Sequence, residues 1–281
     1  MKLRKASAAA AAAVALALTV TACGSGDSGS DGSAGDGNGK GKITVGIKFD
    51  QPGIGLKEPD GSFSGMDVEV AKYVAKDLGY DEKAIEFKET KSADRETALQ
   101  NGDVDFIVAS YSINDERKQK VDFAGPYFLA HQDLLVRADD TSISEATDLN
   151  TKKLCSVTGS TSAQNVKKDF AKNAELVERG GYSECLGALQ NKVVDALTTD
   201  DSILAGYAAQ DQYKGKFKLA GLNLSNENYG IGVKKGSDLT VKINKALEKM
   251  ASDGSWQKVM NETFGPAGYK FEPAPKIGEL K

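Results

Sequence analysis

Histidine is nearly missing from this chain, which has His131 alone among its 281 residues. Nucleophile–histidine–carboxylate catalysis and histidine-rich metal sites both need imidazole groups, so the sequence offers little material for either. A phosphate-binding loop of the G-x-x-x-x-G-K-[S/T] kind is missing too. An active site built on two carboxylates needs none of these, and the sequence leaves it open. We assign His131 itself no functional role.

Long basic stretches are missing as well. The formal net charge is −4, and it becomes more negative if Lys2, Arg4 and Lys5 are removed with a leader segment. The longest basic cluster is residues 117–120 (RKQK), whose plainest interpretation is a solvated helix face. Nucleic-acid binding needs larger clusters of Lys and Arg, so we expect no nucleic-acid partner.

The apolar run at the N-terminus, residues 6–20, is shorter than the about 20 residues that a membrane-spanning helix needs. Basic residues precede this run, and small residues follow it up to Cys23. This order is typical of a secretory signal peptide, which would comprise residues 1–22. A buried alanine-rich helix is the alternative.

Val20-Thr21-Ala22-Cys23 resembles the bacterial lipobox, in which the cysteine receives a diacylglycerol and becomes the first mature residue. Two acyl chains allow stable anchoring, at about 0.8 kcal/mol per buried methylene. Residues 23–41 are otherwise mostly Gly, Ser, Asp, Ala and Asn, which cannot bury a core. We therefore expect a lipid on Cys23, followed by a flexible tether.

Cysteine is scarce, and only Cys155 and Cys185 remain after Cys23. An even pair in an exported protein predicts a disulfide. Two unpaired buried thiols are the alternative. Two cysteines without a nearby histidine supply too few ligands for a structural metal, so we expect no metal ion. No motif indicates a cofactor either.

From residue 42 onward, the sequence predicts alternating strands and helices. In the first part we expect strands at 43–47, 85–88 and 105–109, and helices at 65–79, where Asp67 would cap the start, and at 95–101. The pattern then restarts, with strands at 154–157, 193–198 and 229–233, and helices at 162–172, 184–191 and 201–209. Such alternation predicts an α/β fold with a parallel sheet.

Four segments of this body resemble one family. Residues 63–71 (FSGMDVEVA) resemble the opening motif of the polar amino-acid-binding proteins of ABC importers, the bacterial solute-binding proteins of family 3. Residues 105–127 (DFIVASYSINDERKQKVDFAGPY) are similar to the family's long signature segment. Residues 195–200 (DALTTD) and 229–236 (YGIGVKKG) resemble its second-lobe strand and its return strand. Over about residues 42–264, the chain most resembles actinobacterial glutamate-binding lipoproteins.

The resemblance implies a two-lobe periplasmic-binding-protein fold of the Venus-flytrap type, with two hinge strands. The first lobe would comprise residues 42–136 together with 228–281, and the second lobe residues 137–227. The ligand would lie in the cleft, at the carboxyl ends of the strands, as in other open α/β sheets. The lobes would close around it by a hinge motion.

A free amino acid carries a carboxylate and an ammonium group, and burying both is costly unless each is paired. The resemblance places Arg117 at the family's ligand arginine, and a guanidinium offers a carboxylate two parallel donors. Ser110 and Ser112 precede it and would add hydroxyl and N–H donors. An exposed helix position is the alternative for Arg117.

Asp200 ends a predicted strand and is our candidate for pairing with the ligand's ammonium group. Asp201 is the rival, although it is better placed to cap the helix that follows. Thr158, Ser160 and Thr161 belong to a polar turn that opens a helix, where free N–H groups can bind a carboxylate. Ordinary helix capping is compatible with that role.

Selectivity for the ligand's side chain would depend on Arg95 and Gln51. Acidic-amino-acid binders of the family resemble this chain in having Arg at the position of Arg95, whereas glutamine binders tend to carry an apolar residue. A second arginine would pair with a second carboxylate. The alternative is a surface arginine that bridges Asp94 or Glu96. Gln51, on the first loop, could contact the ligand's side chain.

The sequence thus predicts a monomeric, non-enzymatic lipoprotein on the outer face of the cytoplasmic membrane. It would bind L-glutamate, with aspartate and glutamine as the other candidates. Lobe closure would present the loaded protein to the permease subunits of an ABC importer and, through them, to an ATPase. An enzyme with the same fold, such as a dehydratase, and an amino-acid sensor subunit are the alternatives.

Overall fold

The computed structural model describes residues 41–281. The predicted signal peptide, Cys23 and nearly all of the predicted tether lie outside the described residues. Within residues 41–281, none of the helices combines the length and apolar character that crossing a bilayer requires.

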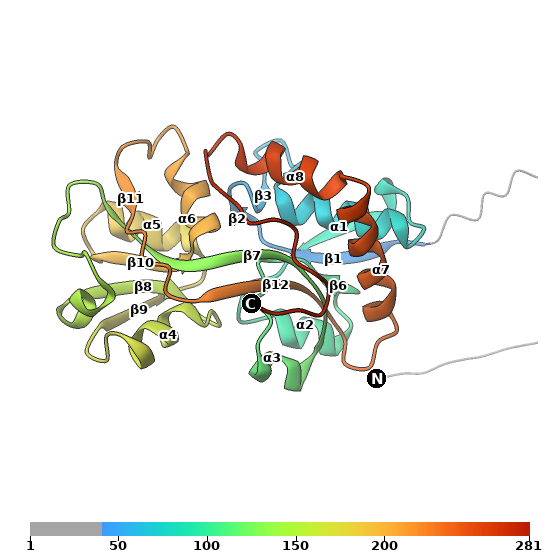
Figure 1. Ribbon diagram of the computed structural model, residues 1–281, viewed down its shortest axis with the longest axis horizontal. Helices are drawn as coiled ribbons and strands as arrows, with labels where there is room; N and C mark the ends of the chain where they lie inside the picture. The colour runs from blue at the N-terminus through green and yellow to red at the C-terminus, as the bar shows by residue number, and fades with distance from the viewer. Residues whose placement is uncertain (1–40) are drawn as a thin grey trace, which may run out of the picture. The chain divides into compact units, whose positions relative to one another are not determined.

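A nine-stranded sheet runs through the described body (Figure 1), in the order β5-β1-β6-β12-β7-β10-β8-β9, with β11 paired to β7. At one end β1 pairs in parallel with β5 and β6, and at the other end β8 pairs in parallel with β9 and β10. These strands are β1 (Ile43–Ile47), β5 (Ile85–Glu89), β6 (Phe106–Ile107), β8 (Lys153–Val157), β9 (Glu175–Arg179), β10 (Ala196–Asp200) and β11 (Phe217–Leu219).

Two long antiparallel strands join the two parallel ends of this sheet: β7 (Asp122–Arg137) and β12 (Asn226–Val233). β7 pairs with β12 as far as His131, and from Gln132 onward it pairs with β10. From the sequence we expect only short strand-like connectors here, near residues 134–137 and 229–233, whereas β7 is 16 residues long. This arrangement confirms the predicted two-lobe α/β fold. The residue boundaries of the lobes, 42–136 with 228–281 and 137–227, stay a proposal.

Helices cover the faces of the sheet in both lobes (Figure 1). The first lobe has α1 (Met66–Asp77), α2 (Arg95–Asn101), α3 (Asp115–Lys120), α7 (Leu239–Ser252) and α8 (Ser255–Phe264); the second has α4 (Ser162–Asp169), α5 (Tyr182–Gln190) and α6 (Asp201–Ala208). The apolar spacing explains their orientation: in α7, for example, the buried residues Ile243, Leu247 and Met250 fall on one face.

The start of α1 differs from the prediction. Gly65 occupies the N-cap position with φ 113°, and Asp67 lies inside the helix, fully buried. The prediction that Asp67 caps the helix is therefore wrong, because its carboxylate has buried partners elsewhere. A small sheet formed by β2 (Asp50–Gln51), β3 (Gly55–Lys57) and β4 (Phe63–Ser64) precedes α1 and was not predicted.

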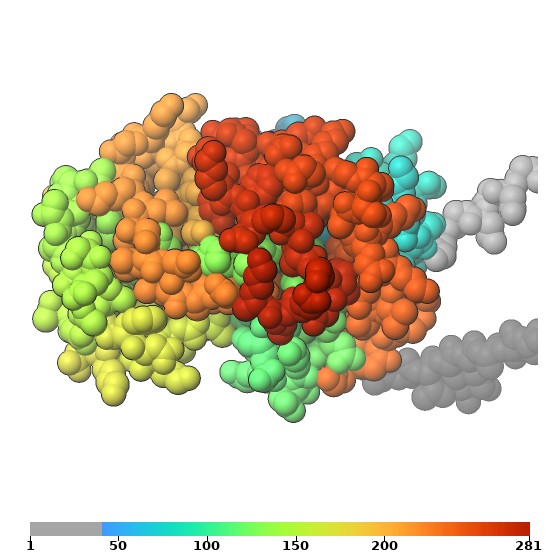
Figure 2. Space-filling view, in the orientation of Figure 1, coloured from blue at the N-terminus to red at the C-terminus, as the bar shows by residue number. Residues whose placement is uncertain are grey.

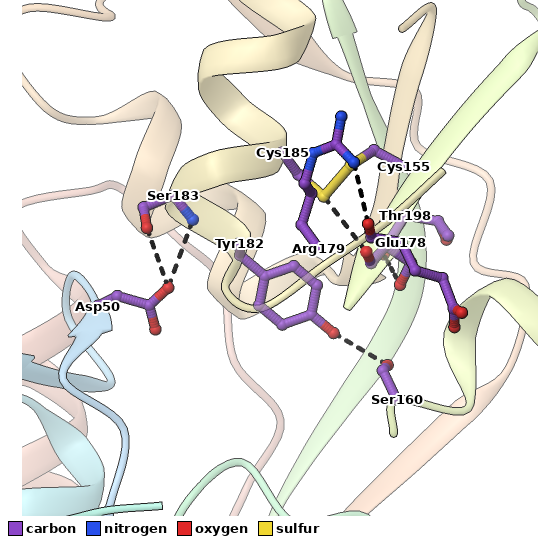
Figure 3. Close-up of a disulfide and its surroundings, with 10 residues drawn as sticks. Asp50, Cys155, Ser160, Glu178, Arg179, Tyr182, Ser183, Cys185 and Thr198 are labelled. Carbon is purple, nitrogen blue, oxygen red and sulfur yellow. Dashed lines mark hydrogen bonds between the residues drawn. A yellow bond between two sulfur atoms is a disulfide. The ribbon is translucent and has the colours of Figure 1, made fainter. Parts of the chain in front are cut away.

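Cys155 and Cys185 form a disulfide, which confirms the predicted pairing (Figure 3). Their Cα atoms are 5.6 Å apart and 30 residues separate them in sequence. The bond joins β8 to α5, so the start of α5 is fixed to the strand that leads into the polar turn at 158–161.

The C-terminal tail, residues 265–281, returns across the hinge strands and appears in dark red in Figure 2. Tyr269 donates a hydrogen bond to Asp201 in the second lobe, over 2.9 Å. At the end of the tail, Lys281 and Asn228 of β12 exchange two hydrogen bonds. The tail therefore contacts both a hinge strand and the second lobe.

Candidate functional site

A small polar cavity lies between the lobes, close to the carboxyl ends of β8 and β10. It is lined by Ser92, Arg95, Ser110, Ser112, Arg117, Ser160, Thr161, Ser162, Tyr182, Asp200 and Ile203. The structure thus brings together seven of the nine ligand-binding residues expected from the sequence, but not Gln51 or Thr158. Each of these two lines a more open hollow that shares residues with the cavity.

Arg117 is buried, not exposed on the surface of α3. Its Nη1 donates to the carbonyl of Ser112 over 2.7 Å, and its Nη2 reaches the carbonyl of Gly159 in the second lobe over 3.2 Å. Nε lies 3.7 Å from a carboxylate oxygen of Glu96. The guanidinium therefore lies at the boundary of the two lobes and donates a hydrogen bond to a backbone carbonyl in each.

Asp200 is the last residue of β10 and lies in the cavity wall, 4% exposed. It accepts a hydrogen bond from the buried hydroxyl of Tyr229. Burial, followed by the nearby charge of Glu227, raises the pKa of Asp200 well above its usual value. A carboxylate in this position gains from a cationic partner, because a positive charge favours its ionised form.

Asp201 does not act as the predicted N-cap. The cap position of α6 belongs to Asp200, and Asp201 is the first helical residue. Its Oδ1 accepts from the backbone N–H of His131 and from Tyr269. These contacts fasten β7 and the tail to the second lobe, and Asp201 is not among the residues that line the cavity.

Arg95 lies at the start of α2 and is 2% exposed, which excludes the alternative of a surface ion pair. Its Nη1 donates to the carbonyls of Ala109 and Ser110, and its guanidinium lies 4.1 Å from the ring centroid of Tyr111. Burial and the charge of Arg117 lower the pKa of Arg95 to about 10. Nε has no hydrogen-bond partner within the described part of the chain, so this arginine retains an unused donor.

Lys48 is a third buried cation, which the sequence analysis missed. It follows β1 directly, is 5% exposed, and donates from Nζ to the hydroxyl of Ser92 over 2.8 Å. Burial and, next, the charge of Arg95 hold the pKa of Lys48 well below its usual value. Its place at the carboxyl end of a parallel strand is the signal that could have revealed it, since ligands bind at such ends.

Asp67 supports the loop that carries Ser110. It accepts from the backbone N–H of Ser110 and from the hydroxyl of Tyr127, each over 2.7 Å. Ser110 has φ 42°, an unfavourable conformation for a residue other than glycine, and this bond helps to hold it. The hydroxyl of Ser110 in turn donates to Oε1 of Gln51, which is fully buried. Gln51 therefore contacts the cavity wall from behind.

The second lobe contributes mainly hydroxyl groups. Ser160, Thr161 and Ser162 line the cavity at the start of α4, and Tyr182 donates from its hydroxyl to Ser160 over 2.9 Å (Figure 3). Tyr182 and Ile203 were not identified from the sequence, because an aromatic or apolar residue near a helix start looks like an ordinary core position. They add an aromatic and an apolar wall.

This arrangement suits a small zwitterion that carries extra negative charge. Arg95 and Arg117 line the cavity, and a third buried cation, Lys48, lies behind it, bonded to the lining residue Ser92. Asp200 provides an anion at the opposite lobe. Uncharged hydroxyl groups fill the space between them. A metal ion would need a different set of ligands, and residues 41–281 contain no cluster of three or more His, Cys, Asp or Glu arranged to hold one.

The sequence is similar to those of proteins named for the amino acids they bind. The glutamate-binding proteins GluB of Corynebacterium efficiens and Corynebacterium glutamicum are each 50% identical to the chain over 234 residues, covering 79% of this chain and 79% and 78% of theirs. The ABC transporter glutamine-binding protein GlnH of Bacillus subtilis is 42% identical over 219 residues, covering 77% of this chain and 79% of its own.

A solved structure of an amino-acid-binding protein is also similar to this chain. An ancestral arginine-binding protein bound to glutamine matches with a TM-score of 0.75 and 38% identity, covering 80% of this chain and 99% of that chain. Residues 43–266 match the family model of the bacterial extracellular solute-binding proteins, family 3, which includes both lobes. The chain therefore belongs to the bacterial extracellular solute-binding proteins of family 3.

Proposed function

We propose that this chain is the L-glutamate-binding lipoprotein of an ABC importer. Arg117 pairs with the α-carboxylate of the ligand and Asp200 with its α-ammonium group. Lys48 and Arg95 hold the γ-carboxylate. The hydroxyl groups of Ser110, Ser112, Ser160 and Thr161 satisfy the remaining oxygens, and Thr158 and Gln51 support the walls.

The observation that carries this proposal is the excess of buried positive charge. One cation is sufficient for an α-carboxylate, yet Lys48, Arg95 and Arg117 are each at least 94% buried around the site. A neutral side chain would leave two of these cations without a counter-ion, which is costly in a dry site. The similarity to two glutamate-binding relatives supports the same ligand.

Calorimetry of the mature protein tests the proposal directly. We expect glutamate to bind most tightly, with glutamine weaker because it lacks the charge and aspartate weaker because its carboxylate is one methylene short. Arginine should not bind, because its guanidinium would approach Lys48 and Arg95. Tighter binding of glutamine than of glutamate would contradict the assignment. Recovery of the ligand chemically unchanged would exclude the alternative of an enzyme.

We further propose that Cys23 carries the lipid and that residues 24–41 tether the body to the outer face of the cytoplasmic membrane. The permease subunits, and through them an ATPase, would be the partners of the loaded, monomeric protein. Cys23→Ala should release the protein from the membrane fraction or leave an uncleaved precursor. Full attachment of a processed Cys23→Ala variant would contradict the lipid anchor.

A further inference from the structure

We propose that a second contact between the lobes, separate from the cavity, acts as a latch that sets the lifetime of the closed state. The latch consists of Asp50 and Pro52 in the first lobe, and of Gly181, Ser183, Gly206 and Tyr207 in the second. None of these residues lines the cavity. This inference rests on the proposed function, because it concerns how an amino acid is retained after it binds.

Asp50 provides the polar half of the latch (Figure 3). Its Oδ2 accepts from the backbone N–H of Ser183 over 3.4 Å and from the hydroxyl of Ser183 over 3.2 Å. It also accepts from the hydroxyl of Tyr207 over 3.4 Å. Tyr207 also donates to the backbone carbonyl of Asp50. The carboxylate thus lies at the positive N-terminal end of α5, a favourable place for a negative charge.

Two glycines make this approach sterically possible. A Cβ on Gly181 would lie 2.7 Å from Oδ2 of Asp50, and a Cβ on Gly206 would lie 2.1 Å from the carbonyl oxygen of Pro52. Gly206 is inside α6, where glycine is less favourable than alanine, and no positive φ requires it there. The nearest obstacle to a side chain at Gly206 is the backbone of the other lobe.

Gly206 therefore matters for the closed arrangement and not for the second lobe alone. When the lobes separate, Pro52 withdraws and a methyl group at position 206 would meet no obstacle from it. A substitution to alanine should then favour the helix of the open form and obstruct the closed form. Gly206→Ala should therefore stabilise the ligand-free protein but weaken lobe closure, so a measurement of stability and a measurement of ligand binding separate the two effects.

Asp50 also contributes to the charge near the cavity, since its negative charge raises the pKa of Lys48. If Asp50 acted only through this field, its removal would leave the site more positive and tighten glutamate binding. The latch predicts the reverse, because removing the carboxylate weakens the contact with Ser183 and Tyr207. The direction of the change therefore distinguishes the two roles.

The experiment compares the mature wild-type protein with Gly206→Ala, Asp50→Asn and the matched control Gly187→Ala. Gly187 is a helical glycine of α5 whose added Cβ would meet nothing within 4 Å. Calorimetry gives the Kd of glutamate and glutamine, exchange of radiolabelled glutamate gives the dissociation rate, and scanning calorimetry gives the ligand-free Tm. Hydrogen exchange of residues 181–184 reports the latch itself.

For Gly206→Ala we expect both ligands to bind at least about 30-fold more weakly, because the closed state becomes a minor population. The ligand-free Tm should be unchanged or higher. Asp50→Asn should speed dissociation about 5- to 10-fold, since a charged acceptor is replaced by a weaker neutral one. Gly206→Ala should keep the wild-type ratio of glutamate to glutamine affinity, and Gly187→Ala should bind normally.

Wild-type affinity and dissociation rate in Gly206→Ala would overturn the latch. A weakened affinity accompanied by a lower ligand-free Tm would overturn it too, because it would indicate a folding defect. Tighter glutamate binding by Asp50→Asn would assign Asp50 to the electrostatic field alone. If the wild type binds no amino acid, the proposed function is wrong. The latch is tested independently of ligand, because equal hydrogen exchange at residues 181–184 in wild type and Gly206→Ala would refute it.

Discussion

Replacing Lys48 with methionine should change the selectivity of the site more than its stability. The lysine is 5% exposed, and its one hydrogen bond within the described residues goes to the neutral hydroxyl of Ser92. Burial and then the charge of Arg95 lower its pKa, and the opposing charge of Asp50 offsets them only in part. A glutamate γ-carboxylate would supply a close counter-ion, whereas the amide of glutamine would not.

The magnitude follows from how the charge is shared. Removing one partner of a buried ion pair costs about 3–5 kcal/mol. Arg95 would remain to hold the γ-carboxylate in Lys48→Met, so we expect about 2 kcal/mol, which corresponds to about 30-fold weaker glutamate binding. Glutamine should bind as well as before or more tightly, because an unpaired buried cation has been removed.

Calorimetry at neutral pH with both ligands measures this change, and Lys83→Met is the matched control for the loss of one positive charge at an exposed position. Equal losses for both ligands in Lys48→Met would refute a side-chain-specific role for Lys48.

Three further outcomes follow from the site and its surroundings. Arg117→Ala or Asp200→Ala should abolish binding of every amino acid in calorimetry, because both pair with groups common to all ligands; retained tight binding would show that the site lies elsewhere. Replacing Cys155 and Cys185 with serine should lower the free energy of unfolding in urea by about 3.6 kcal/mol for a loop of this length. Burial raises the pKa of Asp67 from 3.8 to about 7, so its contribution to stability is fully present below pH 3.8 and is lost as the pH rises to about 7. Asp67→Asn should flatten that part of the urea-measured stability curve, by up to about 1.4 kcal/mol per pH unit.

Local sequence patterns predicted most helices and the parallel strands, because apolar spacing and glycine stops are local signals. Only the end of β7, near residues 134–137, was predicted, since Pro126 lies within the strand and proline normally argues against a strand interior. In the structure, the register of β7 against β12 shifts between Tyr229 and Ile231, which accommodates the irregular segment. That compensation comes from a strand about 100 residues away and cannot be read locally.

The candidate site was predictable where a residue ends a strand or belongs to the family's signature segment. Ser110, Arg117 and Asp200 were proposed in this way, and Arg95 through the resemblance alone; all four line the cavity. Lys48 was missed because burial decides its role, and a lysine beside polar residues looks solvated in sequence. Asp67 was misplaced for the same reason: a capping rule considers the nearest turn, whereas its partners, Ser110 and Tyr127, are at least 43 residues away.

The change of partner along β7 has a consequence for the order of events in binding. β7 leaves β12 after His131 and joins β10 at Gln132, whose register partner is Asp200. In a rigid rotation, the path of each atom is proportional to its distance from the axis. If the lobes turn about this junction, Asp200 hardly moves while Ser183 travels much farther. The ligand's ammonium group can then pair with Asp200 in the open form. The ligand is already oriented when Ser183, on the far side of the second lobe, reaches the first lobe.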